Sequence, residues 1–240
     1  MPAMRLVEPE VLDELSPQDA RARRSRRDLR RVHRAMGTVS ILKRAIARMA
    51  LAKPPRRILE LGAGDGTLLL RLARALRPRW REVRLTLLDR HDLLEARTRQ
   101  AYARLGWSTE ALRAEIDSWS REGAGTHYDL CVATLFLHHF EEPQLRSILA
   151  AVAERSDALV ACEPHRGTLS RLGARGIGLI GAGSITRADA ATSVAAGFRG
   201  LELTAHWKAC TAGWVLEERR AWPFTHCFSA VRAEARGASA

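Results

Sequence analysis

The residues whose types and spacing could do chemistry begin near position 60, where an acidic residue precedes three glycines. Glu60 is followed by Gly62, Gly64 and Gly66 at alternate positions. Glycine has no Cβ and tolerates positive φ, so a turn built from it lets a ligand approach the backbone closely. A carboxylate just before such a turn suits a ligand with a cationic group better than a ligand with a pyrophosphate. We therefore expect a ligand-binding turn that recognises positive charge.

Two common phosphate-binding turns do not match this stretch. The dinucleotide fingerprint G-x-G-x-x-G requires its third glycine where Thr67 stands. The P-loop of nucleotide-binding proteins requires Gly-Lys-Ser/Thr, and the turn has no such tripeptide. Both absences argue against the usual phosphate-bearing cofactors.

The glycines must be positioned by the elements on either side of them. Residues 58–61 form a short apolar run that predicts a buried strand, and leucines recur at helical spacing over 68–76. A second predicted strand, 83–89, ends at Asp89. A carboxylate about 20 residues beyond the glycine turn can accept hydrogen bonds from both hydroxyls of a ribose. This arrangement also occurs in NAD-binding folds, so it indicates a nucleoside without choosing between ligands.

Residues 60–66, Glu-Leu-Gly-Ala-Gly-Asp-Gly, resemble motif I of class I S-adenosylmethionine (SAM)-dependent methyltransferases. SAM carries an ammonium and a sulfonium and no phosphate. The resemblance extends over residues 56–232 and implies SAM as the cofactor. We expect a third strand over residues 112–116. The resemblance implies that an acidic residue directly after this strand binds the adenine amino group. The residues that it assigns to SAM are Glu60, Gly62, Gly64, Asp65, Gly66, Asp89, Arg90, Asp117, Ser118 and Thr134.

The segment after the fourth predicted strand, 128–134, holds the candidate catalytic residues. Leu137-His138-His139-Phe140 resembles the corresponding segment of quinone-biosynthesis methyltransferases, and the chain is also similar to methyltransferases encoded beside type III polyketide synthases. In such a site a histidine could deprotonate a phenol, with His138 the better candidate. The alternative is that each histidine merely binds neighbouring backbone. Glu163, Arg187 and His206 are candidate substrate contacts, and we expect no metal site.

Nucleobase chemistry is disfavoured by the same region. Enzymes that methylate exocyclic amines of DNA carry Asn/Asp-Pro-Pro-Tyr after the fourth strand, and this chain has Thr134-Leu135-Phe136-Leu137. Cytosine-C5 enzymes need a nucleophilic cysteine on a loop, whereas Cys131 lies inside the predicted strand. The four cysteines form no C-x-x-C pair, so we expect free thiols in a reducing cytoplasm.

The order of the predicted elements indicates the fold. Residues 1–55 read as a helical extension, with one helix from Ser16-Pro17 to about Met36 and a second capped by Thr38. A helix is expected over 91–105. Strands and helices then alternate, which predicts a doubly wound, mostly parallel α/β sheet of seven strands.

Two features depart from the alternation near its end. Residues 165–213 are a glycine-rich insertion, in which Thr186 to Asp189 reads as a capping box; we expect this insertion to select the acceptor. Strands near 214–221 and 224–231 are joined by so short a link that they must form an antiparallel hairpin. The SAM-binding methyltransferase domain is therefore expected over 56–240.

Composition sets broader limits. The chain has 240 residues, a net charge of +12 and 46% hydrophobic residues, enough for one α/β domain with additions. No apolar run is long enough to span a membrane, and the N-terminus lacks the features of a signal peptide. Lysine occurs only at positions 43, 53 and 208, so the charge is almost entirely arginine. Arginines crowd residues 21–34, which predicts a solvated helix face or a contact with an anionic membrane, an acidic carrier protein or RNA.

These observations predict a cytoplasmic SAM-dependent methyltransferase of secondary metabolism that acts on a small aromatic or lipid-like acceptor. O-methylation of a phenolic or polyketide compound is the leading reading. The alternatives are C-methylation of a quinol-type ring and an RNA methyltransferase anchored by the arginine-rich helix. Peripheral attachment to a membrane also stays open. The sequence sets neither the acceptor atom nor the oligomeric state.

Overall fold

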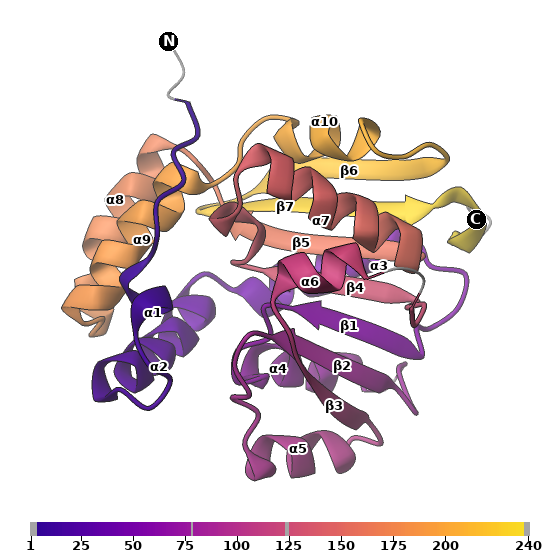
Figure 1. Cartoon of the computed structure of the whole chain (residues 1–240), viewed down its shortest axis with the longest axis horizontal. Helices are drawn as coiled ribbons and strands as arrows, with labels where there is room; N and C mark the ends of the chain where they lie inside the picture. Colours follow the sequence, from indigo (N-terminus) through magenta and orange to yellow (C-terminus); the bar gives the residue numbers. More distant parts are fainter. Residues whose placement is uncertain (1–3, 78, 123–124, 238–240) are drawn as a thin grey trace.

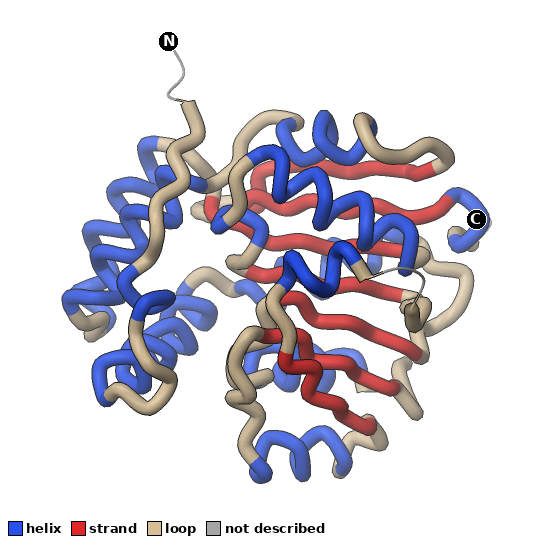
Figure 2. The backbone as a smooth tube through the Cα atoms, viewed as in Figure 1, coloured by secondary structure: helices blue, strands red, loops and turns tan. Residues whose placement is uncertain are grey.

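The fold was obtained as a computed structural model, which describes residues 4–77, 79–122 and 125–237. Its centre is one seven-stranded sheet with the order β3-β2-β1-β4-β5-β7-β6 (Figure 2). The first five strands are parallel, and β7 is antiparallel to both β5 and β6. The predicted fold class and terminal hairpin are therefore confirmed. The strands are β1 (Arg57–Leu61), β2 (Arg84–Asp89), β3 (Ser108–Arg113), β4 (Leu130–Thr134), β5 (Ala158–Pro164), β6 (Trp214–Ala221) and β7 (Thr225–Arg232).

Helices cover both faces of the sheet, which explains why β4 and β5 read as unbroken apolar runs (Figure 1). Successive strand residues point to opposite faces. Ile58 belongs to one apolar core and Leu59 to the other. The first core is covered by α3 (Thr38–Met49), α4 (Thr67–Leu76) and α5 (Ala96–Ala103). The second is covered by α6 (Ile116–Arg121), α7 (Glu142–Arg155) and α10 (Glu202–Lys208).

A separate layer of helices lies beyond the C-terminal ends of the parallel strands (Figure 1). Helix α9 contacts α1, α2 and α8, and α2 also contacts η2. We call these elements the outer layer: α1 (Val11–Glu14), α2 (Ala20–Ala35), α8 (Thr168–Gly176), η2 (Ile177–Ile180) and α9 (Ser184–Ala196). The buried carboxylate of Asp28 on α2 connects this helix to α9, because it accepts hydrogen bonds from the Gly183 N–H and the Thr186 hydroxyl.

The outer layer divides the chain differently from the expected boundaries. Helix α3 lies within residues 1–55 but packs on β5, β7 and α4 as part of the sheet core. Helix α10 lies within 165–213 but packs on α7 and β6. The segments that cross the strand ends are therefore shorter than the predicted extension and insertion.

The predicted third strand and the helix before it contain the largest error. The strand expected over 112–116 is β3, which ends at Arg113, and Ile116 instead opens helix α6. The spacing of buried residues changes here from that of a strand to that of a helix. Ile116 and Trp119 are three residues apart, and both are buried on one face of α6. The helix expected over 91–105 is also shorter, because α5 begins only at Ala96.

Two predicted helix caps are wrong as well. The first long helix begins at Ala20, where Asp19 rather than Ser16 accepts the capping hydrogen bond. Gly37, with φ of 64°, ends α2 as expected and is itself the residue before α3, so Thr38 is not its cap.

The capping box expected at Thr186 and Asp189 does not form, because both side chains bind other elements of the outer layer. Thr186 donates to Asp28, and Asp189 accepts the N–H groups of Val11 and Leu12. Helix α9 begins earlier, at Ser184.

Two further expectations can be compared with the described residues. All four cysteines lie among them and are free thiols, with Cys210 exposed and the others buried. Within those residues no helix is long and apolar enough to cross a membrane.

Candidate active site

The turn between β1 and α4 requires glycine at each of its three positions. Gly62, Gly64 and Gly66 all have positive φ, at 64°, 55° and 69°. A Cβ on Gly62 would also overlap the ring of Phe136. The Gly66 carbonyl accepts a hydrogen bond of 2.8 Å from the Tyr102 hydroxyl, which supports the turn from below. The sequence folds this way because only glycine combines the left-handed backbone with so close an approach.

Glu60, the last residue but one of β1, lies next to this turn as a buried carboxylate without a counter-charge. Its Oε2 atom has no hydrogen-bond partner among the described residues. Burial raises the pKa of Glu60 well above its usual value, and the negative charges of Asp65 and Asp89 raise it further. A ligand ammonium group would supply both the missing hydrogen bond and the missing positive charge.

Asp89 ends β2 beside the turn. Its Oδ2 accepts the Gly64 N–H at 2.8 Å, and its Oδ1 accepts the His91 N–H at 2.9 Å. A carboxylate has about four acceptor sites, so each oxygen keeps capacity for a ligand hydroxyl. The strand end, the glycine turn and Asp89 thus form one rigid cradle.

A cavity of about 720 Å³ lies over this cradle at the C-terminal ends of β1, β2 and β4. We call it the large cavity. Most residues that the sequence assigned to SAM line it, namely Glu60, Gly62, Gly64, Asp65, Asp89, Arg90 and Thr134. Gly66 shapes the turn without lining the cavity. The arginine-rich helix α2 forms the opposite wall, with Arg26, Arg27, Arg30, Arg31 and Arg34 along it.

Asp117 and Ser118 do not line the large cavity, contrary to the prediction. They belong to α6, and Asp117 accepts a hydrogen bond of 2.7 Å from the Gln144 amide on α7. Residues 114–116 line the wall in their place. The error follows directly from the misplaced end of the third strand.

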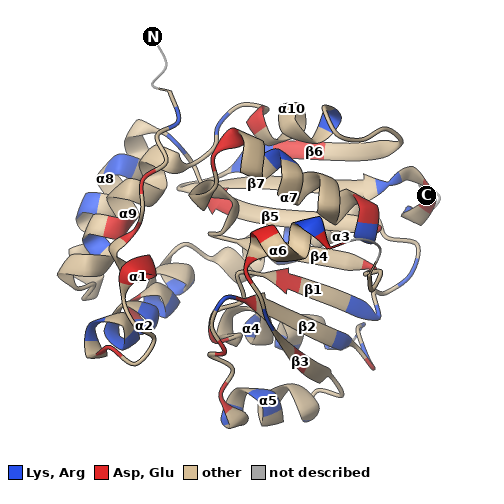
Figure 3. Ribbon diagram, in the orientation of Figure 1, with Lys and Arg blue, Asp and Glu red and all other residues tan. Residues whose placement is uncertain are grey.

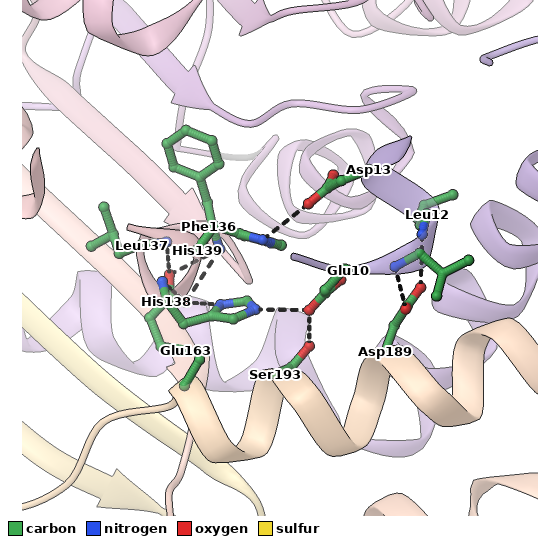
Figure 4. A network of polar contacts seen from close by, with 12 residues as sticks. Glu10, Leu12, Asp13, Phe136, Leu137, His138, His139, Glu163, Asp189 and Ser193 are labelled. Atoms are coloured by element: carbon green, nitrogen blue, oxygen red, sulfur yellow. Dashed lines mark hydrogen bonds and ion pairs between the residues drawn. The ribbon is translucent and has the colours of Figure 1, made fainter. Parts of the chain in front are cut away.

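A chain of polar groups around His138 forms part of the wall of the large cavity, and Figure 4 shows its hydrogen bonds and ion pairs. His138 Nδ1 lies 2.8 Å from Glu163 Oε2, and its Nε2 lies 3.4 Å from Glu10 Oε1. Burial alone would lower the pKa of His138, but the hydrogen bonds to Glu10 and Glu163 outweigh it and raise that pKa to about 9. Near neutral pH the ring is therefore an imidazolium between two carboxylates.

His139 has a different partner. Its Nδ1 lies 3.2 Å from Asp13 Oδ2 on α1. Asp13 also pairs with Arg90 at 2.8 Å. Burial alone would raise the pKa of Asp13, but His139 and Arg90 lower it. The contacts of Asp13 with His139 and Arg90 thereby hold α1 at the wall of the large cavity.

A second cavity of about 130 Å³ lies between α2, α8, η2 and α9. We call it the apolar cavity. Its walls are mainly hydrophobic and include Leu29, Val32, Met36, Ile177, Val194 and Phe224. Glu10, Leu135 and Ser193 line both cavities. The two cavities therefore meet beside His138, at the C-terminal end of β4.

Residues 58–156 match the family model described as a methyltransferase domain. These residues carry a methyltransferase domain, and the fold is that of class I SAM-dependent methyltransferases. The plantazolicin methyltransferase BpumL, solved with S-adenosylhomocysteine (SAH), superimposes with a TM-score of 0.64 at 13% identity, over 90% of this chain and 91% of its own. Among curated proteins, no sequence matches the chain significantly.

Two further solved methyltransferases have the same fold. Magnesium protoporphyrin IX methyltransferase from Synechocystis PCC 6803, with bound SAM, has a TM-score of 0.51 at 14% identity and covers 87% of this chain and 83% of its own. An O-methyltransferase family protein from Burkholderia thailandensis has a TM-score of 0.55 at 17% identity. The match covers 89% of this chain and 60% of that protein's chain. The cofactor of this methyltransferase is SAM. The cradle suits it, because Glu60 lacks a positive partner and the glycine turn leaves room for a ligand.

The predicted substrate contacts of the methyltransferase are placed differently from the expectation. Glu163 lies behind His138, fully buried, where it also accepts the N–H groups of Phe136 and Leu137. Arg187 is exposed on α9 beside Gly178 and lines neither cavity. His206 lies on α10 near Arg146, on one face of the sheet and away from both cavities.

Sequence reasoning missed the groups that the N-terminal segment brings to this site. Glu10 and Asp13 come from residues far from the histidine pair in the sequence, and Ser193 comes from α9. Their local sequence has no motif that signals a site. Only the packing of α1 on α9, capped by Asp189, carries them to the strand ends.

Proposed function

We propose that this methyltransferase transfers a methyl group from SAM to an oxygen of a small aromatic or lipid-like acceptor, such as a phenolic or polyketide compound. One observation carries the proposal. The apolar cavity adjoins the large cavity at Glu10, Leu135 and Ser193, close to His138, so an acceptor with a hydrophobic body could present one polar atom to the methyl donor. Substrate pockets with apolar walls and few polar groups select this class of ligand.

The SAM cradle supports the donor half of the proposal. In this reading Glu60 pairs with the SAM ammonium, and Asp89 accepts the ribose hydroxyls. The turn at Gly62 and Gly64 lets the ligand lie against the backbone. Bound SAM supplies an electrophilic methyl group on a sulfonium that becomes neutral when the methyl leaves.

The junction of the two cavities supports the acceptor half. An in-line displacement depends on alignment of the acceptor oxygen with the methyl and sulfur atoms, which is proximity catalysis. Walls from α2, η2 and α9 would hold the acceptor body in one direction. A phenol also has to lose its proton, and in this proposal one of the polar groups around His138 receives it.

The decisive experiment incubates the protein with methyl-labelled SAM and a panel of phenols, resorcinols, hydroxypyrones and quinols, and identifies the products by mass spectrometry. We expect O-methylated products, with hydrophobic substituents lowering KM. Products methylated on ring carbon would replace this proposal with the quinol reading. Salt-steep binding of RNA in a filter assay, together with methylated RNA, would replace it with the RNA reading.

A variant tests the acceptor pocket separately. Ala190 lines the apolar cavity but not the large cavity, so Ala190→Phe should fill the pocket while SAM binding persists. We expect an unchanged SAM affinity in calorimetry and a raised KM for hydrophobic acceptors. An unchanged KM would exclude the apolar cavity as the acceptor site.

A further inference from the structure

Glu10 is one of the residues that line both cavities. Figure 4 shows its side chain between His138 and Ser193. It lies immediately before α1, and its residue is only 9% exposed. Among the described residues that line both cavities, Glu10 is the only one with a charged side chain, so an acceptor held in the apolar cavity would meet this carboxylate where the cavities adjoin. The residue is thus nearer the acceptor route than Glu163, which lies behind His138.

The two carboxylate oxygens of Glu10 are in different situations. Oε1 is held by the Ser193 hydroxyl and by His138 Nε2. Oε2 has no hydrogen-bond partner among the described residues. It is not fully buried, so a ligand could contact it. One oxygen therefore fixes the carboxylate, and the other remains able to accept a proton from a ligand.

His138 is poorly placed to be the base that the sequence predicted. Both of its ring nitrogens face carboxylates, Glu163 at 2.8 Å and Glu10 at 3.4 Å. An imidazolium held in this way has no lone pair for a further proton. Burial alone would raise the pKa of Glu10, but the hydrogen bond from His138 and the charges of both histidines lower it. His138 thus keeps Glu10 ionised.

We propose that Glu10 is the catalytic residue that takes the proton of the acceptor hydroxyl, and that His138 and Glu163 position it. The inference rests on the proposed function. The acceptor oxygen forms a bond to the methyl carbon, the bond between that carbon and sulfur breaks with its electron pair remaining on sulfur, and the hydroxyl proton passes to Glu10 Oε2. The products are the methyl ether, SAH and a protonated Glu10.

A carboxylate is a strong enough base for this step. The acceptor proton becomes much more acidic as the oxygen shares its lone pair with the methyl group, so transfer late in the displacement is downhill. The titratable groups that face these polar residues are His138 and His139 from the 3-10 helix η1 (Leu137–His139), Asp13 from α1, Glu163 from β5 and Asp189 from α9.

The test compares Glu10→Gln with Glu8→Gln, a change of an exposed carboxylate two residues earlier. We expect Glu10→Gln to lower kcat about 100-fold or more, the usual contribution of a positioned base, while the SAM dissociation constant is unchanged. Glu8→Gln should behave as the unmodified enzyme. Because Glu10 must be ionised, kcat of the unmodified enzyme should fall at acid pH, and Glu10→Gln should lose this limb. His138→Gln should shift the limb to higher pH.

Three results would overturn the inference. One is full kcat in Glu10→Gln together with inactivity of His138→Gln, which makes His138 the base. Another is loss of activity in a chelator with recovery on adding a divalent metal, because ligand atoms of Glu10, His138 and His139 lie within 4.8 Å of one another and would then be metal ligands. A third is SAM binding without methylation of any hydroxyl acceptor by the unmodified enzyme; this result alone also removes the proposed function.

Discussion

At the scale of single residues, the position of Glu60 suits a cationic ligand but lowers the stability of the ligand-free protein. Its carboxylate is buried with one oxygen unpartnered, and its folded-state pKa lies well above the ordinary value. A group with a raised folded pKa contributes its full stability below the unfolded pKa and loses it as pH rises toward the folded value. Above the unfolded pKa, the buried carboxyl group of Glu60 therefore disfavours the ligand-free fold, and a bound ammonium group would reverse this.

The first prediction follows from this conflict. Glu60→Gln keeps the shape but removes the ionisable group, so the ligand-free variant should melt several degrees higher than the unmodified protein at pH 8. The difference should shrink near pH 4, where both side chains are neutral. SAM affinity should fall about 10-fold or more, since a charge-assisted hydrogen bond is lost. Thermal unfolding across pH and calorimetry measure both effects.

Glu110→Gln, at an exposed position on β3, is the matched control and should change neither quantity. Equal melting temperatures of Glu60→Gln and the unmodified protein at pH 8 would contradict the account of Glu60 as an uncompensated charge.

The second prediction concerns Asp89. Asp89→Ala removes the acceptor of the Gly64 and His91 N–H groups and the proposed ribose contact. We expect SAM to bind about 10- to 100-fold more weakly, from the loss of hydrogen bonds to a charged group worth about 1.5–3 kcal/mol. Calorimetry with SAM and SAH measures this. Asp92→Ala, in the same loop, should bind normally; an equal loss in both variants would point to a general disturbance of the loop.

At the scale of elements, Asp28 connects segments that lie far apart in the sequence. It belongs to α2, is 1% exposed and accepts hydrogen bonds from Gly183 and Thr186 at the start of α9. Arg31 adds an ion pair at 2.8 Å. The pairing holds α2 against α9, and these two helices form facing walls of the apolar cavity.

The third prediction is that Asp28→Ala weakens the outer layer. Two buried donors would lose their acceptor, which costs about 1–3 kcal/mol for each unsatisfied group. We expect a lower urea midpoint and faster proteolysis within residues 16–36. Asp28→Asn retains an acceptor oxygen and should lie between the alanine variant and the unmodified protein. If the asparagine and alanine variants were equally stable, the charge rather than the hydrogen bonds would hold the layer.

The elements also explain where sequence reasoning succeeded. Ile58, Leu59 and Leu61 of β1 and residues 130–133 of β4 are buried on both faces, so short apolar runs identified these segments as central strands. The hairpin was predictable because a two-residue link permits no parallel crossover. The prediction of a strand over 112–116 was wrong because apolar residues at alternate positions over so short a stretch also fit one turn of a helix. Trp119 packs in the core together with Ile116, which favours helix α6.

At the scale of the whole molecule, the basic charge is distributed unevenly. Blue segments gather on α2 and α8, in the outer layer, whereas the sheet core carries few of them (Figure 3). The sequence left open whether the arginines of α2 form a solvated face. The structure turns several of them toward the large cavity, where Arg30 pairs with Asp65 at 3.2 Å. The arginine-rich helix is therefore a wall of the site as well as a surface.

The fourth prediction uses this arrangement. Because α2 lines the large cavity, bound SAH should slow tryptic cleavage at its arginines, and saturation at 100 times the dissociation constant should add about 2.7 kcal/mol to stability. Mass spectrometry of the fragments over time measures the protection. Asp89→Ala, at the same SAH concentration, should be protected less. Equal cleavage rates with and without SAH would mean that α2 is not coupled to the cofactor site.

The sequence by itself determined the sheet, the glycine turn and the carboxylates at the ends of β1 and β2. These features depend on patterns within a few residues: apolar runs, positive φ at glycine, and the position of a polar residue at a strand end. They are therefore visible without the fold, and with motif I they indicated the donor.

Only the tertiary structure decided what surrounds the acceptor. Glu10 and His138 meet although they are 128 residues apart, and no local pattern fixes which nitrogen of the ring faces which carboxylate. Packing of the outer layer sets the apolar cavity, the burial that shifts each pKa, and the place of Glu10 between the cavities. Long-range contacts of this kind are set by the summed packing of many side chains, and a single sequence does not reveal them.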